Sequence, residues 1–180
     1  EEMYRKVSES RHDLSEEEAR KIAKIIGLSA IKYGDLSNQA SKYYIFDIDR
    51  FTSFEGDTGP YILYTIVRIK SILAKYQEQG KRLENLCLEE AQGASEKDLM
   101  RQLCSFNAMM DSACEETAPH KICAYIYDLA NAFNKFYHET KILAEEDAGK
   151  QKSYIALLKV TKDVLEACID VLGFEAPERM

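Results

Sequence analysis

Glycine and proline are scarce in this sequence, which contains 8 glycines and 3 prolines among 180 residues. Hairpins and tight turns depend on these two residue types, so their scarcity favours helices over sheets. Long apolar runs are missing as well, since no stretch approaches the roughly 20 apolar residues of a membrane-spanning helix. The first residues lack the basic-then-apolar order of a secretory signal. We therefore expect a cytoplasmic protein that does not contact a membrane.

Patterns typical of catalysis and metal binding are also absent. His12, His120 and His138 show no metal-ligand spacing, and no glycine-rich phosphate loop occurs. Asp-Thr-Gly at residues 57–59 resembles an aspartic protease motif, but it precedes Pro60 and a helix rather than lying in a β loop. The five cysteines form no Cys-x-x-Cys pair and most occupy apolar helical positions, so we expect buried free thiols. No catalytic residue, metal or cofactor is expected in this chain.

The formal net charge of −7 argues against indiscriminate binding of polyanions, because such proteins usually carry a basic excess. The charge is nevertheless segregated along the chain. Residues 61–82 contain five basic residues and one acidic residue, for a local charge of +4, and the next stretch is acidic. A local basic face is therefore compatible with the overall acidity.

Capping signals predict where the first helices begin. A serine–glutamate capping box starts a helix at about Ser15, and Gly34-Asp35 ends or interrupts it. Residues 43–51 are aromatic and β-branched, which predicts a short extended segment or one irregular helical turn. Asp57 or Thr58 then caps a long helix that has proline in its first turn and reaches about residue 80.

The second half predicts three further helices. Residues 81–94 are interpreted as a charged connection that contains a helical turn. A helix capped at Ser95 follows, and its buried stripe is expected to be Leu99, Leu103, Phe106, Met110 and Cys114. The last two helices should run from Pro119 to about Leu143 and from about Lys150 to Leu172. The sum is an all-α helical bundle of five or six helices around one core.

The helix after Pro60 carries two separate stripes at helical spacing. The core stripe is expected to be Leu63, Ile66, Ile69 and Leu73. Tyr61, Tyr64 and Arg68 face another direction, and two rings beside a guanidinium can stack unpaired bases and hold a phosphate. Tyrosines at this spacing are more often packing residues, so packing is the alternative. Packing is likewise the plain interpretation of an aromatic pair at 133 and 137 on the later helix.

Several stretches together form specific motifs. Residues 30–37 read Ala-Ile-Lys-Tyr-Gly-Asp-Leu-Ser, residues 54–64 read Phe-Glu-Gly-Asp-Thr-Gly-Pro-Tyr-Ile-Leu-Tyr, and the chain closes on Pro-Glu-Arg-Met at 177–180. Tyr-Asp-Leu-Ala at 127–130 and Phe-Asn at 133–134 lie between them. Over nearly its whole length the chain resembles the C-terminal region of arginyl-tRNA synthetases, which are class I aminoacyl-tRNA synthetases.

The resemblance implies a helical anticodon-binding domain at residues 57–180, joined by a connecting segment at residues 1–56 to a catalytic domain. That domain would hold ATP and Mg²⁺, and the parent enzyme would convert ATP, L-arginine and tRNA(Arg) to arginyl-tRNA(Arg), AMP and diphosphate. The two class I signature motifs are absent here, so this chain alone should be inactive. We expect a monomer whose partners are the anticodon loop of tRNA(Arg) and its own catalytic domain, which would cover apolar surface of residues 1–56.

The resemblance also implies which residues bind tRNA. The aromatic pair and the arginine after the Gly-Pro dipeptide correspond to Tyr61, Tyr64 and Arg68. Two aromatics on the later helix and the chain-ending methionine correspond to Phe133, Tyr137 and Met180. Tyr43 stands where the family commonly has an acid, so a contact of that acid would be missing or replaced. The alternative function is a helical protein–protein interaction module that buries the aromatic patch against a partner helix.

Overall fold

The computed structural model describes residues 1–10 and 13–180, so His12 lies outside the described residues. Within these ranges the chain is helical and has no strand. Its elements are α1 (Glu2–Ser10), α2 (Glu16–Leu36), α3 (Ile48–Phe51), α4 (Gly59–Glu78), α5 (Ala94–Cys104), α6 (Phe106–Glu115), α7 (Pro119–Glu139), the 3-10 helix η1 (Ile142–Ala144) and α8 (Ala148–Val171). None of these helices is both long and apolar enough to cross a membrane.

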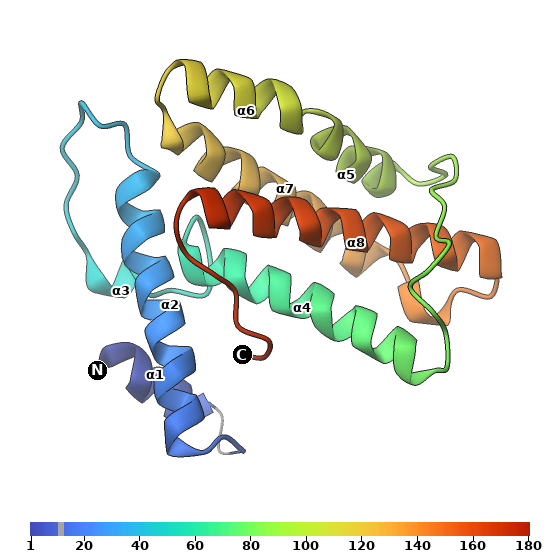
Figure 1. Ribbon diagram of the computed structural model, residues 1–180, viewed down its shortest axis with the longest axis horizontal. Coiled ribbons are helices and arrows are strands. Elements are labelled where there is room, and N and C mark those ends of the chain that lie inside the picture. The colour runs from blue at the N-terminus through green and yellow to red at the C-terminus, as the bar shows by residue number, and fades with distance from the viewer. Residues whose placement is uncertain (11–12) are drawn as a thin grey trace.

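Three long helices form the centre of the bundle (Figure 1). α4 and α7 both pack against α8 and against each other, while α5 and α6 pack on α7. α2 crosses one end of this group and packs against α4, with α1 beside it. The expected core stripe of α4 is confirmed, because Leu63, Ile66 and Ile69 are 0% exposed and Leu73 is 6% exposed. The all-α bundle predicted from the sequence is also confirmed.

The junction before α4 is fixed by a cap and a close approach. The Thr58 hydroxyl oxygen accepts a hydrogen bond from a backbone N–H of the first turn, so Thr58 rather than Asp57 caps α4. Asp57 instead accepts a hydrogen bond from the Tyr33 hydroxyl of α2, at 2.5 Å. A Cβ added at Gly59 would lie 2.3 Å from the Ser29 carbonyl oxygen of α2. The glycine therefore allows α4 to start directly against α2.

The first predicted helix is confirmed at its start and runs slightly past its expected end. Ser15 is the N-cap of α2, and both hydrogen bonds of its capping box are present. α2 continues to Leu36, beyond Gly34, where a Cβ would lie 2.4 Å from the Phe51 ring. Gly34 thus makes room for an aromatic ring instead of ending the helix. α3 is a single helical turn, which is one of the two forms expected for residues 43–51.

Four expectations for the second half are wrong. The single helix expected after residue 95 is two helices, because α5 ends before Ser105 and α6 begins after it. Gly93 rather than Ser95 is the N-cap of α5. The Glu96 carboxylate accepts hydrogen bonds from the backbone N–H groups of Gln92 and Gly93. Residues 81–93 contain no helical turn. α7 also ends earlier than expected, with η1 occupying the last residues assigned to it.

The sequence predicts that most of the five cysteines are buried, but only two of them are. Cys123 and Cys168 are buried, whereas Cys87, Cys104 and Cys114 are exposed, and all five are free thiols. Cys104 and Cys114 therefore meet solvent although α5 and α6 pack on α7. Burial raises the pKa of the Cys123 and Cys168 thiols to about 12.

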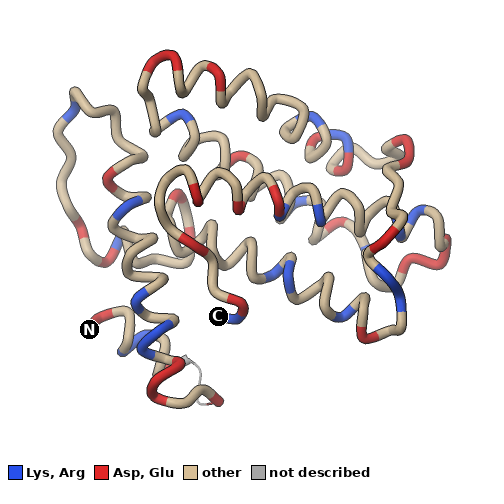
Figure 2. The backbone as a smooth tube through the Cα atoms, in the orientation of Figure 1, with Lys and Arg blue, Asp and Glu red and all other residues tan. Residues whose placement is uncertain are grey.

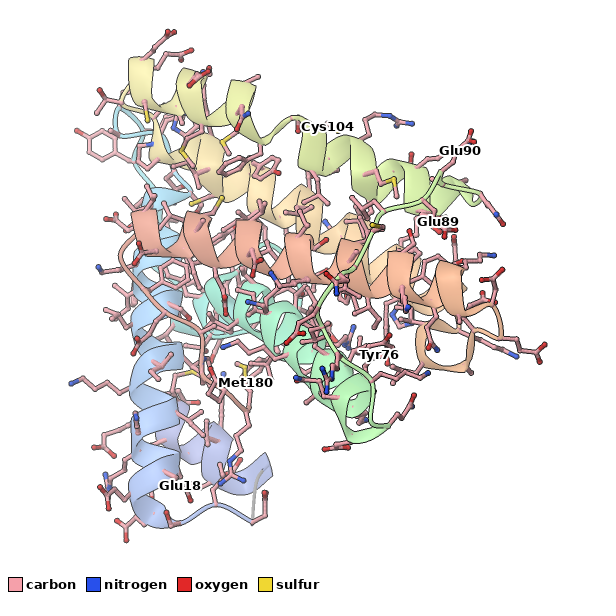
Figure 3. All side chains as sticks on the ribbon, turned by 45° about the vertical axis from the view of Figure 1, so that its right-hand side comes forward. Glu18, Tyr76, Glu89, Glu90, Cys104 and Met180 are labelled. Carbon is pink, nitrogen blue, oxygen red and sulfur yellow. The ribbon has the colours of Figure 1, made fainter. Side chains whose placement is uncertain are left out.

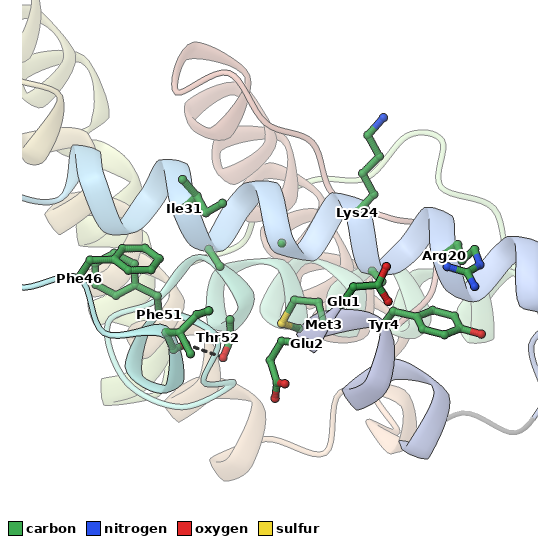
Figure 4. Close-up of a pocket in the computed structure, with 14 residues that line it drawn as sticks. Glu1, Glu2, Met3, Tyr4, Arg20, Lys24, Ile31, Phe46, Phe51 and Thr52 are labelled. Carbon is green, nitrogen blue, oxygen red and sulfur yellow. Dashed lines mark hydrogen bonds between the residues drawn. The ribbon is translucent and has the colours of Figure 1, made fainter.

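Residues of α2, α3 and the loop between them expose an apolar surface. Met3 and Val7 of α1 are buried in the same core as the rest of the chain. Ile31, Phe46 and Ile48 are 57%, 55% and 51% exposed, respectively. An open hollow of about 450 Å³ lies between α1, α2 and α3 beside these side chains (Figure 4). Coverage of this surface by a catalytic domain stays a prediction, as does the boundary at residue 56.

Candidate functional site

Tyr64 and Arg68 of α4 meet Tyr137 of α7 on the outside of the bundle. The Arg68 Cζ lies 4.7 Å from the centroid of the Tyr64 ring and 5.1 Å from that of the Tyr137 ring. Arg68 Nη2 also donates a hydrogen bond to the Tyr64 hydroxyl oxygen at 3.1 Å. The two rings are 42% and 37% exposed, so solvent reaches both. With Tyr61, these three residues are called the tyrosine–arginine cluster.

Asn134 of α7 holds this cluster together. Its Oδ1 accepts a hydrogen bond from Arg68 Nη1 at 2.6 Å, and its Nδ2 donates to the Tyr61 hydroxyl oxygen at 2.9 Å. Nδ2 also donates a hydrogen bond to Thr65 Oγ1 at 3.3 Å. The Tyr61 hydroxyl in turn donates to Asn131 Oδ1 at 2.7 Å. One amide side chain therefore fixes both the guanidinium and the first tyrosine of α4.

Neither asparagine was singled out from the sequence as a site residue. Asn134 belongs to the Phe-Asn motif, and Asn131 lies three residues before it, on the same side of a helix. Their spacing indicates a shared face, but nothing in the sequence says which helix that face meets. Only the packing of α7 beside α4 brings Asn134 to Arg68.

Tyr61 is placed differently from Tyr64. Its ring is half-buried and packs edge-on against Tyr127, with centroids 5.8 Å apart. Burial raises the pKa of the Tyr61 hydroxyl, so this group stays protonated at neutral pH. Tyr61 thus combines the packing and surface roles that were considered for it as alternatives.

Phe133 lies in the core rather than on the surface. It is 0% exposed, and its ring stacks beneath the Tyr137 ring with centroids 6.1 Å apart. This agrees with the packing interpretation of Phe133 and leaves Tyr137 as the exposed member of the pair. A direct contact between Phe133 and a ligand would require Tyr137 to move.

The C-terminal tail docks on a different part of α4. Glu178 forms an ion pair with Lys70 at 2.7 Å, and Arg179 pairs with Glu18 of α2 at the same distance. Lys70 is two residues from Arg68, which on a helix places it about 200° away. Met180 is partly buried against the core, between α2 and α4 (Figure 3). The tail is therefore ordered by specific contacts, and a role for Met180 in binding stays a prediction.

The basic residues of 61–82 do not gather on one face. Figure 2 shows them spread along α4 and the turn that follows it. Lys70 pairs with Glu166 at 3.2 Å as well as with Glu178, so two carboxylates offset its charge. Lys81 donates a hydrogen bond to Gln151 of α8. The local charge of +4 counted along the sequence therefore does not form a single patch.

Chemically, the tyrosine–arginine cluster suits a flat, electron-rich or anionic ligand. Two partly exposed aromatic faces permit stacking, and a guanidinium held between them supplies hydrogen-bond donors and positive charge. Guanidinium has five N–H donors, and the two hydrogen bonds to Asn134 and Tyr64 leave others for a ligand. No group of three or more potential metal-ligand side chains occurs among the described residues.

Comparison with known proteins identifies similar chains. The family model described as DALR anticodon binding domain matches residues 62–180. The arginine–tRNA ligases of Agathobacter rectalis and Alkaliphilus oremlandii are 61% and 48% identical, each over 99% of this chain. The Thermus thermophilus arginyl-tRNA synthetase structure is similar with a TM-score of 0.86 at 28% identity, covering 99% of this chain and 30% of its own. The chain spans 31% and 30% of the length of the two curated relatives.

Proposed function

Because the chain belongs to the DALR anticodon-binding domain family, we propose that it binds the anticodon loop of an arginine tRNA through the tyrosine–arginine cluster. The observation that carries the proposal is Arg68 held between the exposed rings of Tyr64 and Tyr137. The whole protein would be an arginine–tRNA ligase of the cytoplasm. Its sites for ATP, Mg²⁺ and arginine would lie outside residues 1–180.

Each side chain of the cluster has a distinct task in this proposal. Tyr64 and Tyr137 stack on bases that the anticodon loop leaves unpaired, because every base presents a π-face. Arg68 donates hydrogen bonds to a base edge or a phosphate, where its positive charge strengthens them. Tyr61 contributes mainly through its hydroxyl, and Phe133 supports the Tyr137 ring from below. Met180 of the docked tail would also contact the RNA.

The direct test is binding of an RNA hairpin with the anticodon stem-loop of arginine tRNA, followed by fluorescence anisotropy. Base–aromatic stacking is worth roughly 1 to 3 kcal/mol, so Tyr64→Ala should weaken binding about tenfold or more. Tyr64→Phe keeps the ring and should bind nearly as well as the parent. A hairpin with altered anticodon bases should bind less tightly to the parent than the original does.

Tyr43 provides a matched control, because its side chain is fully exposed in the loop before α3. Tyr43→Ala should leave RNA binding unchanged. Equal binding by the parent and by Tyr64→Ala, with Arg68→Ala and Tyr137→Ala also unchanged, would reject this site. A chain that ignores the RNA and binds an amphipathic peptide instead would support the interaction-module alternative, which the family match disfavours.

A further inference from the structure

A second hollow opens at the side of the tyrosine–arginine cluster. It has a volume of about 530 Å³ and lies between the last turns of α4 and the segment that runs from the end of α7 through η1. The buried side chains of Ile72 and Ile142 contribute an apolar floor. Its size falls within the usual range for small-molecule sites, and its open shape suits a segment of a longer ligand.

The hollow is continuous with the cluster. Tyr137 lines it and also packs against Arg68, so the two features share a side chain. On α4, Lys75 lines the hollow and follows Arg68 by seven residues, which places both on the same face of the helix. The rise along this stretch is about 10.5 Å, or two helical turns. A single strand that stacks on the cluster would enter the hollow when it continues toward the end of α4.

The basic side chains of the hollow are available to a ligand. Lys75 and Lys141 are both exposed, and neither forms an ion pair with any residue in 1–10 or 13–180. His138 also lines the hollow, where its ring packs edge-on against Tyr137 with centroids 5.5 Å apart. Glu139 is the opposing acidic residue in this lining. Lys70, by contrast, already has two carboxylate partners and cannot serve equally well.

We propose that this hollow binds the sugar and phosphate of a nucleotide next to the bases stacked on the tyrosine–arginine cluster, with Lys75 and Lys141 neutralising the phosphodiester. The inference rests on the proposed function and adds a backbone subsite to it. An apolar floor beneath two ammonium groups matches a ribose beside a phosphate. Such a contact raises affinity and fixes the register of the strand but reads no base.

The test uses salt dependence, because phosphate contacts release counterions and stacking contacts do not. For single strands, the slope of the logarithm of the binding constant against the logarithm of the salt concentration becomes more negative by about 0.7 for each phosphate neutralised. Because the two lysines share one phosphodiester, the double variant Lys75→Gln, Lys141→Gln should make the slope shallower by about 0.7, and each single variant by a part of that amount. These variants should still bind the original hairpin more tightly than the hairpin with altered anticodon bases, by the same factor as the parent. Lys24 is an exposed lysine of α2, so Lys24→Gln is the matched control and should keep the parent slope.

The outcomes separate this inference from the function on which it rests. If the parent binds the hairpin with base preference but the double variant keeps the parent slope, the hollow is not a phosphate subsite. If the parent fails to bind the hairpin at all, the proposed function itself is wrong. A shallower slope in the double variant but not in Lys24→Gln supports the subsite. Tyr64→Ala should lower affinity at every salt concentration without changing the slope.

Discussion

At the scale of single residues, Asn134 determines how the side chains of the tyrosine–arginine cluster are held. It bonds Arg68 and Tyr61 simultaneously, so Asn134→Ala leaves the guanidinium bonded only to Tyr64 and removes one of the two hydrogen bonds of the Tyr61 hydroxyl. A lost hydrogen bond of this kind costs about 1 kcal/mol, or roughly fivefold in affinity. We expect Asn134→Ala to weaken hairpin binding by about that factor and to reduce the preference for the original anticodon, both measured by anisotropy titration.

The loss of anticodon preference distinguishes a positioning role from a purely structural one. Asn131→Ala is the control, because Asn131 is exposed and bonds only Tyr61 among the contacts described above. It should keep the base preference. An Asn134→Ala chain that discriminates the two hairpins as well as the parent does would show that Arg68 needs no such support.

At the scale of elements, a glycine of α4 and a glycine of α2 should respond in opposite directions to alanine. Gly59→Ala would force a Cβ against the Ser29 carbonyl at 2.3 Å, so α4 and α2 must separate. Overpacking of this kind typically costs about 1 to 3 kcal/mol of the free energy of unfolding. Gly27→Ala in α2 would meet Met3 at 3.7 Å, an ordinary contact, and should stabilise the chain by about 0.5 to 1 kcal/mol.

Urea unfolding followed by circular dichroism measures both changes. The Gly27→Ala result checks that alanine is tolerated inside α2, so a loss at Gly59 can be assigned to the α2–α4 contact. Gly59→Ala with the stability of the parent would contradict the close approach of the two helices.

At the scale of the whole molecule, Lys70 links three segments: α4, α8 through Glu166 and the tail through Glu178. Burial raises the pKa of the Glu166 carboxyl, but its ion pairs with Lys162 and Lys70 lower it by more, so the net pKa lies below the usual value of a glutamate. A carboxylate with a depressed pKa stabilises the fold above its unfolded pKa and loses that effect as the pH falls. The free energy of unfolding should therefore be flat near pH 7 and decline below about pH 5.

Urea titrations across this pH range test the decline. Asp163 has a lowered pKa for the same reason and contributes in the same direction. Glu166→Gln should be less stable than the parent at pH 7 and show a shallower loss in acid. A parent whose stability rises between pH 5 and pH 3 would contradict the assignment of these ion pairs.

Local signals in the sequence determined much of the helical framework. The capping box at Ser15, the threonine before the Gly-Pro pair and the glycine at 173 each act within a few residues, so the bounds of α2, α4 and α8 were nearly right. No comparable signal in the sequence marks the break between α5 and α6 at Ser105. Both helices pack on α7, so we attribute this break to tertiary packing. Periodicity also identified the core stripe of α4, since a buried face repeats at the helical period.

The sequence by itself also determined that Tyr64 and Arg68 share one face of α4, because residues four apart on a helix are neighbours. Only the tertiary structure decided that Phe133 is buried beneath Tyr137 and that Asn134 joins the two helices. It also decided that Lys70 is neutralised while Lys75 remains beside an open hollow. These outcomes depend on which helix faces which. Helix pairing depends on contacts between residues about 70 positions apart. The residues of a short stretch of sequence therefore cannot predict it.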